Sequence, residues 1–136
     1  MTPGAARILI VDDDEDNRNL LQLVMSLEGF DAVMAESGEE ALAMIAEQVP
    51  DLVLLDIMMP EMNGFEVIAE LRRRYAPRHI LVILVSALDD AKTRLLAREA
   101  GADDFFTKPI DRADLCVRIR KLLAPAADPS SRGERG

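Results

Sequence analysis

Short strand-like runs of β-branched and aliphatic residues alternate along this chain with longer segments in which apolar residues recur every three or four positions. Most of the short runs are continuously apolar, which is typical of strands buried on both faces of a parallel sheet. Successive parallel strands need a crossover, usually a helix. The chain is therefore predicted to fold as a doubly wound α/β domain with five strands and five helices. The expected strands are Arg7–Val11, Ala32–Ala35, Leu52–Leu55, Ile80–Val85 and Asp104–Thr107.

The segments between the strands carry start signals for helices. Asp14 or Asp16 is expected to cap the first helix, and Asp111 the last, because a short acidic side chain can accept a hydrogen bond from the free N–H groups of a first turn. Apolar stripes with helical spacing predict a third helix over Phe65–Tyr75 and a polar fourth helix over Asp89–Ala100.

The chain has 136 residues, of which 49% are hydrophobic, so it has room for one domain with a single core. That domain is expected to span residues 7–123. Residues 1–6 are expected to form a flexible N-terminus. Residues 124–136 are rich in proline, serine, glycine and charge, and we expect a disordered tail or linker there.

The formal net charge of -9 argues against direct binding of nucleic acid or of anionic lipid, because like charges repel. No stretch approaches the roughly 20 apolar residues that span a bilayer, and the first residues do not resemble a secretion signal. Cys116 is the single cysteine, which excludes an internal disulfide and is consistent with a reducing compartment. We therefore expect a cytoplasmic protein with no membrane partner.

Side chains that can bind a metal ion or a phosphoryl group follow four of the predicted strands. Asp12 and Asp13 come after the first strand, Asp56 after the third, Ser86 after the fourth and Lys108 after the fifth. The carboxyl ends of parallel strands share one edge of a sheet, where ligands bind. Three carboxylates gathered there need a cation, and a site of oxygen ligands without His or Cys favours Mg²⁺. A hydroxyl and a lysine beside it suit a phosphoryl group.

Four segments resemble the signature segments of the receiver domain of bacterial two-component response regulators. They read ILIVDDD, LLDIMMPEMNGFE, LVSA and FFTKPI, and they occur in the family's order and spacing. The similarity covers roughly Arg7 to Leu123. It implies a flavodoxin-like, doubly wound parallel sheet with the strand order 2-1-3-4-5.

The resemblance also implies a metal-dependent phosphoacceptor. Asp56 would attack a phosphohistidine of a partner and become an aspartyl phosphate. Asp13, Asp56 and the backbone carbonyl of Met58 would bind Mg²⁺ directly, whereas Asp12 would act mostly through a bound water.

The remaining implied roles concern the switch. Ser86 would donate a hydrogen bond to the new phosphoryl group, and Lys108 would pair with another of its oxygens. The Lys108–Pro109 peptide would be cis. Phe105 corresponds to the aromatic residue whose inward rotation accompanies activation in the family, where tyrosine is frequent, so here it can act only through packing.

The function implied is a phosphorylation-controlled switch that is not an enzyme beyond catalysing its own phosphorylation and dephosphorylation. The phosphoryl donor would be a sensor histidine kinase or a histidine phosphotransfer protein. The surface from the fourth helix through the fifth strand to the fifth helix, about Asp89 to Leu123, would then change its preference for an output domain, an output protein or a second copy.

An alternative is a phosphatase or mutase with an aspartyl nucleophile, for which Asp12 or Asp14 is the candidate. The chain lacks the Thr or Val expected to complete that family's first motif and has no room for a cap domain. A nucleotide site is weaker still, because no glycine-rich phosphate-binding motif is present.

Several other residues have structural interpretations. His79 is expected to be a solvated loop residue without a role, and Met58, Met59 and Met62 are expected to pack around the loop after the third strand. Met58 and Leu88 each lie two residues past a site residue and cannot orient water by a hydrogen bond. They predict slow hydrolysis of the aspartyl phosphate.

Overall fold

A computed structural model describes residues 5–124 of the chain. Its strands form one parallel sheet in the order β2-β1-β3-β4-β5, which confirms the predicted fold class and strand order. The chain order reverses between β1 and β3, and sheets of this kind bind ligands beyond the carboxyl ends of the strands at such a point. The strands are β1 (Arg7–Val11), β2 (Asp31–Ala35), β3 (Leu52–Asp56), β4 (Leu81–Ser86) and β5 (Asp104–Thr107).

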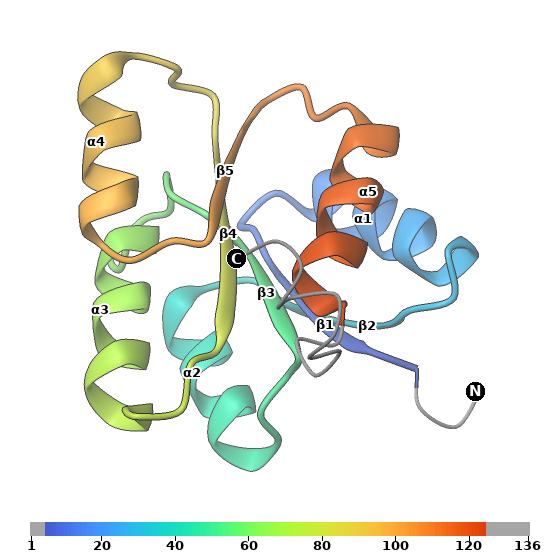
Figure 1. The fold of residues 1–136 in the computed structure, drawn as a ribbon, viewed down its shortest axis with the longest axis horizontal. Coiled ribbons are helices and arrows are strands. Elements are labelled where there is room, and N and C mark those ends of the chain that lie inside the picture. Colours follow the sequence, from blue (N-terminus) through green and yellow to red (C-terminus); the bar gives the residue numbers. More distant parts are fainter. Residues whose placement is uncertain (1–4, 125–136) are drawn as a thin grey trace, which may run out of the picture.

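A helix follows each strand, and the helices cover both faces of the sheet. In Figure 1, α1 and α5 lie on one face, whereas α2, α3 and α4 lie on the other. This arrangement buries the central strands on both sides, as their continuously apolar sequences predict. The helices are α1 (Glu15–Leu27), α2 (Gly38–Glu47), α3 (Gly64–Tyr75), α4 (Ala91–Glu99) and α5 (Arg112–Leu123).

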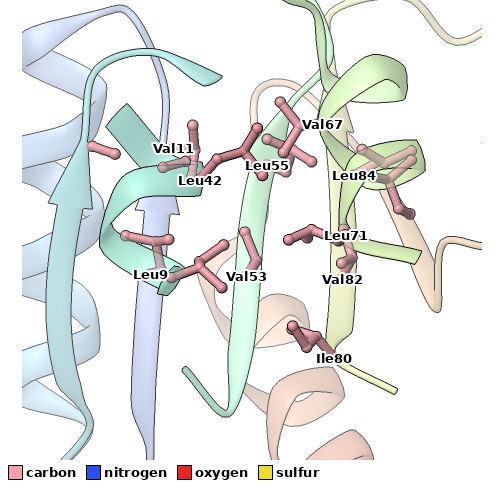
Figure 2. Close-up of a cluster of buried hydrophobic side chains, with 14 of the residues drawn as sticks. Leu9, Val11, Leu42, Val53, Leu55, Val67, Leu71, Ile80, Val82 and Leu84 are labelled. Atoms are coloured by element: carbon pink, nitrogen blue, oxygen red, sulfur yellow. The ribbon is translucent and has the colours of Figure 1, made fainter. Parts of the chain in front are cut away.

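The hydrophobic core consists of two clusters separated by the sheet. Successive side chains of a strand point to opposite faces, so Leu9 joins the cluster under α2 and α3 while Ile8 joins the cluster under α1 and α5. Figure 2 shows the first cluster, in which strand residues meet Leu42, Val67 and Leu71 from the covering helices. The two clusters hold the strands, and hence the residues at their carboxyl ends, in a rigid frame.

Element boundaries differ from the prediction by one or two residues at the functional edge. β3 includes Asp56 and β4 includes Ser86, because the backbones of these polar residues still pair with the neighbouring strands. The fourth helix begins at Ala91 rather than Asp89, since Asp90 caps it by accepting a hydrogen bond from the Thr93 N–H at 2.7 Å.

The predicted caps of the first and last helices are present. Asp14 caps α1 and accepts a hydrogen bond from the Asp16 N–H at 3.3 Å, which resolves the choice between these two acids. Asp111 caps α5 through the Asp114 N–H at 3.0 Å. Among residues 5–124, no helix is long and apolar enough to cross a membrane.

The chain termini lie largely outside the described residues. The flexible N-terminus predicted for residues 1–6 and the tail or linker predicted for residues 124–136 fall mostly on residues 1–4 and 125–136, so they stay predictions. The carbonyl of Ala6 already accepts a hydrogen bond from the Asp31 N–H at 2.8 Å. Pairing between the first two strands therefore starts one residue before β1.

His79 lies in the loop before β4 and is exposed, as expected, and it belongs to a polar cluster at the opposite end of the sheet that was not predicted. Its Nε2 lies 2.8 Å from Asp103 Oδ1, although the side chain is about half exposed. Asp103 Oδ2 also accepts a hydrogen bond from the Val82 N–H at 2.8 Å. The Arg72 guanidinium donates to the carbonyls of Ile80 and Gly101 at 2.7 and 2.8 Å. These contacts join the loops before β4 and β5, which are neighbouring strands.

Candidate functional site

Three carboxylates meet at the carboxyl edge of β1 and β3. Asp12, Asp13 and Asp56 each offer an oxygen, and these oxygens lie within 4.8 Å of one another. Asp12 and Asp56 are almost completely buried, with 3% and 4% of their surface exposed, whereas Asp13 is exposed. Because β1 and β3 are adjacent in register, the folding of the sheet itself brings these residues together.

Lys108 lies across from the two buried carboxylates. Its Nζ is 3.3 Å from Asp12 Oδ2 and 3.3 Å from Asp56 Oδ2, so one ammonium group is shared between two acids. The Lys108–Pro109 peptide is cis, as the family resemblance implies. With Asp13 alongside, the cluster holds three acids and one base. The site therefore retains a local surplus of negative charge.

Burial and crowding change the acidity of the central carboxyl group. The pKa of Asp56 is raised from 3.8 to about 6, first by burial and then by the negative charge of Asp12. Lys108 opposes both effects by its charge and its hydrogen bond. Burial tends to lower the pKa of Lys108, but its attraction to Asp56 and Asp12 outweighs burial and raises that pKa above its usual value. Asp56 is thus a carboxylate held ionised mainly by a neighbouring cation.

The Lys108→Met substitution is expected to raise the pKa of Asp56 above 6. The lysine is the main group that favours the ionised form, and methionine retains most of its volume without the charge. A pH titration of the Asp56 side-chain carbon by NMR, without divalent cations, measures this shift directly. An unchanged or lowered pKa would contradict this electrostatic role of the lysine. The Lys92→Met variant, which alters an exposed lysine on α4, is the control and should leave that pKa unchanged.

The donor set fits a hard divalent cation. It consists of carboxylate oxygens with excess negative charge, and neither His nor Cys belongs to the cluster of described residues. The Met58 N–H donates to Asp56 Oδ1 at 3.2 Å, which places the loop after β3 beside the acids. Met58 lies beside Met59 and Asn63 of this loop, but 56% of the residue is exposed, so it packs there only in part. Met59 is buried, and Met62 packs against the core, as predicted.

Ser86 lies at the end of the neighbouring strand and is fully buried. Its backbone carbonyl accepts a hydrogen bond from the Lys108 N–H at 2.8 Å, and its Oγ accepts one from the Leu88 N–H at 3.0 Å. Within the described residues, no hydrogen bond joins the Ser86 hydroxyl to Asp56 or to the Lys108 ammonium group. The structure thus brings Ser86 to the predicted edge, with its hydroxyl proton available for another acceptor.

Two arginines near the site were not predicted. Arg18 of α1 donates from Nη1 to the carbonyl of Asp12 at 2.7 Å, and only 13% of its side chain is exposed. Arg94 of α4 lies over the half-buried Phe105 ring, 4.8 Å from its centroid. The only sequence signal for Arg18 is a cation one turn into a helix that follows an acidic loop, and Arg94 has no such signal.

Of the two alternative nucleophiles, Asp14 caps α1 and is not in the carboxylate cluster of the described residues, whereas Asp12 belongs to that cluster. Asp56 combines a central position, burial and a shared ammonium group. This arrangement can present one carboxylate oxygen to an electrophile while cations neutralise the charge that accumulates, which is what phosphoryl transfer to a protein requires.

Comparisons with known proteins point the same way. A family model described as the response regulator receiver domain matches residues 8–120. The response regulator PleD of Caulobacter vibrioides is 47% identical over 118 residues, which is 87% of this chain and 26% of PleD. The transcriptional regulatory protein CpxR of Klebsiella pneumoniae is 41% identical over 86% of this chain and 49% of CpxR. The chain thus spans between a quarter and a half of the length of these relatives.

Solved structures share the whole fold. The activated receiver domain of RstA from Klebsiella pneumoniae, determined with BeF3, has a TM-score of 0.80 and 32% identity over 88% of this chain and 99% of that one. The receiver domain of a histidine kinase from Syntrophus aciditrophicus has a TM-score of 0.83 and 32% identity over 91% and 94% of the two chains. The match of the family model, these relatives and the sheet order agree, and the chain belongs to the family of response-regulator receiver domains, which are signalling domains switched by phosphorylation.

Proposed function

We propose that Asp56 is the phosphoacceptor of this receiver domain. One observation carries the proposal: Asp56 is buried at the sheet edge among oxygen ligands, and its Oδ2 lies 3.3 Å from the ammonium group of Lys108. A carboxylate oxygen of Asp56 attacks the phosphorus of a phosphohistidine. The new O–P bond forms as the P–N bond breaks, and the electron pair remains on the imidazole nitrogen of the donor.

The residues around Asp56 have distinct parts in this reaction. Asp13, Asp56 and the Met58 carbonyl would hold Mg²⁺ directly, and Asp12 would hold it through a water. The bound ion would neutralise phosphoryl oxygens. Lys108, which now pairs with Asp12 and Asp56, is close enough to turn to a phosphoryl oxygen. Receiver domains bind Mg²⁺ at an acidic pocket of this kind, and the oxygen donor set supports the same assignment here.

The switch follows from the charge added at Asp56. A phosphoryl group adds about two negative charges, which attract Lys108 and the Ser86 hydroxyl. Phe105 then fills the space behind Ser86, and the surface formed by α4, β5 and α5 changes. Exposed apolar side chains on α4, including Leu95 and Leu96, support its use as a contact surface.

The partners follow from this chemistry. We infer that a sensor histidine kinase or a histidine phosphotransfer protein supplies the phosphoryl group. The altered surface would act on an output domain, an output protein or a second copy, which allows phosphorylation-dependent dimerisation. The chain would catalyse only its own phosphorylation and dephosphorylation. A cytoplasmic location and the absence of direct nucleic-acid binding stay predictions.

The reaction can be tested with acetyl phosphate as the donor. The chain is expected to gain one phosphoryl group in the presence of Mg²⁺ and none when EDTA removes divalent cations, as measured by intact-protein mass spectrometry. The group should be lost in mild base, because an acyl phosphate hydrolyses easily. Labelling that is equal with and without Mg²⁺ would refute the proposal.

Slow loss of the phosphoryl group is a further prediction. Met58 lies in the loop after β3 and Leu88 in the loop after β4, and both side chains are exposed. Because they are apolar, they cannot orient an attacking water by a hydrogen bond. The double variant Met58→Asn, Leu88→Glu is expected to hydrolyse the aspartyl phosphate about threefold faster or more, because its polar groups can position water. Decay of the labelled protein after donor removal gives the rate.

The control is Leu95→Glu, which adds the same charge at an exposed position on α4. It should leave the hydrolysis rate as in the wild type. Equal rates for the wild type and the double variant would show that these two side chains do not limit water attack.

A further inference from the structure

The guanidinium group of Arg94, on the surface of α4, contacts the two segments that adjoin Ser86 and Lys108. Arg94 forms an ion pair and a hydrogen bond with Asp89 through Nε. Its Nη2 lies 3.4 Å from Thr107 Oγ1, and its central carbon lies 4.8 Å from the centroid of the Phe105 ring. The distance to the ring is within the range of a cation–π interaction. Arg94 thus links the loop after β4 to the edge strand β5.

The contacted residues are close in sequence to the site. Asp89 follows Ser86 by three residues, and Thr107 immediately precedes Lys108. Phe105 lies on the same strand as Thr107. The loop after β4 is also tied to Ser86 itself, because the Ser86 Oγ accepts the Leu88 N–H at 3.0 Å. The Ser86 hydroxyl is thus connected through Leu88 to the neighbouring Asp89, which contacts Arg94.

We propose that Arg94 is a latch that stabilises the resting conformation of the switch and sets how readily the chain responds to phosphorylation. This proposal rests on the proposed function of Asp56 as the phosphoacceptor. When Ser86 and its loop move towards a phosphoryl group, Asp89 is drawn away from Arg94. When Phe105 turns inward, its ring leaves the guanidinium. Each movement therefore breaks a contact of Arg94, the first with Asp89 and the second with Phe105.

The contacts of Arg94 shift the equilibrium between the resting and active conformations towards the resting one. A ligand that binds only the active conformation has its apparent affinity reduced by the fraction of chains in that conformation. Removing Arg94 removes contacts made only at rest, which raises that fraction. Because about half of the Arg94 side chain is exposed, each contact is modest. We expect roughly threefold to tenfold tighter binding of a phosphoryl mimic after the loss of all three contacts.

The experiment uses beryllofluoride with Mg²⁺ as the phosphoryl mimic and follows binding by fluorine NMR. Arg94→Gln is compared with the wild type and with Arg98→Gln, which removes the same charge from an exposed position on the same helix. Arg94→Gln should bind beryllofluoride threefold to tenfold more tightly than Arg98→Gln. Arg94→Lys, which keeps the charge for Asp89 but lacks the planar group that covers the ring, should lie between the wild type and Arg94→Gln.

A double-mutant cycle with Phe105→Leu isolates the contact with the ring. If Arg94 acts partly through Phe105, the effect of Arg94→Gln should be smaller in the Phe105→Leu background. Equal affinities of Arg94→Gln and Arg98→Gln, or weaker binding by Arg94→Gln, would overturn the latch. Such a result would leave the proposed function intact, because the wild type would still bind the mimic. Failure of the wild type to bind it in Mg²⁺ would overturn the proposed function and the latch together.

Discussion

Asp56→Asn is expected to abolish phosphorylation by acetyl phosphate and, at the same time, to stabilise the metal-free domain at about pH 8. The first effect follows because the amide is a poor nucleophile. The second follows from the raised pKa of Asp56, which is about 6 in the folded chain against an ordinary value of 3.8. A group that binds its proton more tightly when folded loses its stabilising contribution as the pH rises from about 4 to 6.

The size of this effect can be bounded. A shift from 3.8 to about 6 corresponds to no more than about 3 kcal/mol of destabilisation by the ionised carboxylate above pH 6. The amide that replaces the carboxylate would lose the attraction of Lys108 but could still accept the Met58 N–H. A net gain of about 1 to 2 kcal/mol in the free energy of unfolding at pH 8 is therefore expected. The gain should disappear near pH 4, where the carboxyl group of folded Asp56 is largely protonated.

Urea unfolding in EDTA at a series of pH values measures the difference between Asp56→Asn and the wild type. Asp31→Asn is the matched control, because Asp31 lies at the start of β2 and pairs with Arg7 at 3.5 Å, away from the carboxyl edge. It should keep full labelling and gain no stability. A loss of stability in Asp56→Asn at pH 8 would contradict the electrostatic account of the pocket.

Gly64→Ala is expected to destabilise the fold by about 1 to 3 kcal/mol and to weaken Mg²⁺ binding. A Cβ atom at Gly64 would lie 2.7 Å from the backbone oxygen of Asp56 and 2.9 Å from the Cα of Ile57. Both are backbone atoms, in the last residue of β3 and in the residue after it, and they cannot yield as a flexible side chain would. Relief of the clash would therefore shift the Asp56 backbone itself.

The contrast is Gly29→Ala. Gly29 has a φ of 91°, and a Cβ atom added to it would meet nothing within 4 Å, so alanine there would be strained only by its own backbone conformation. The substitution should cost about 1 kcal/mol and leave Mg²⁺ affinity unchanged. Denaturant unfolding and a metal titration of both variants separate the two effects. Wild-type affinity for Mg²⁺ in Gly64→Ala would contradict the close approach at β3.

The fold and the main site were predictable because they follow from local pattern and topology. Continuously apolar runs separated by helical stripes specify a covered parallel sheet, and a parallel sheet brings the residues after its strands to one edge. Asp12, Asp56 and Lys108 are far apart in sequence, yet they meet for this reason alone. Their chemistry could then be inferred from residue type.

Other features depend on side-chain reach and backbone approach, which no local pattern encodes. Arg94 reaches Asp89 and Phe105 only because α4 crosses beside β5, and His79 meets Asp103 only because two loops lie at the same end of the sheet. Gly64 resembles an ordinary turn residue until its distance from Asp56 is known. The exposure of single side chains could not be predicted from the sequence either, since Met58 and Met59 are adjacent but only Met59 is buried.

The most direct test of the proposed phosphoacceptor is to identify the residue that carries the phosphoryl group. The chain is labelled with acetyl phosphate in Mg²⁺, the acyl phosphate is trapped by borohydride reduction, and the modified residue is located by peptide mass spectrometry. Modification is expected at Asp56 alone. Modification of Asp12 or Asp14 instead would contradict the assignment, because the nucleophile would then belong to the loop after β1.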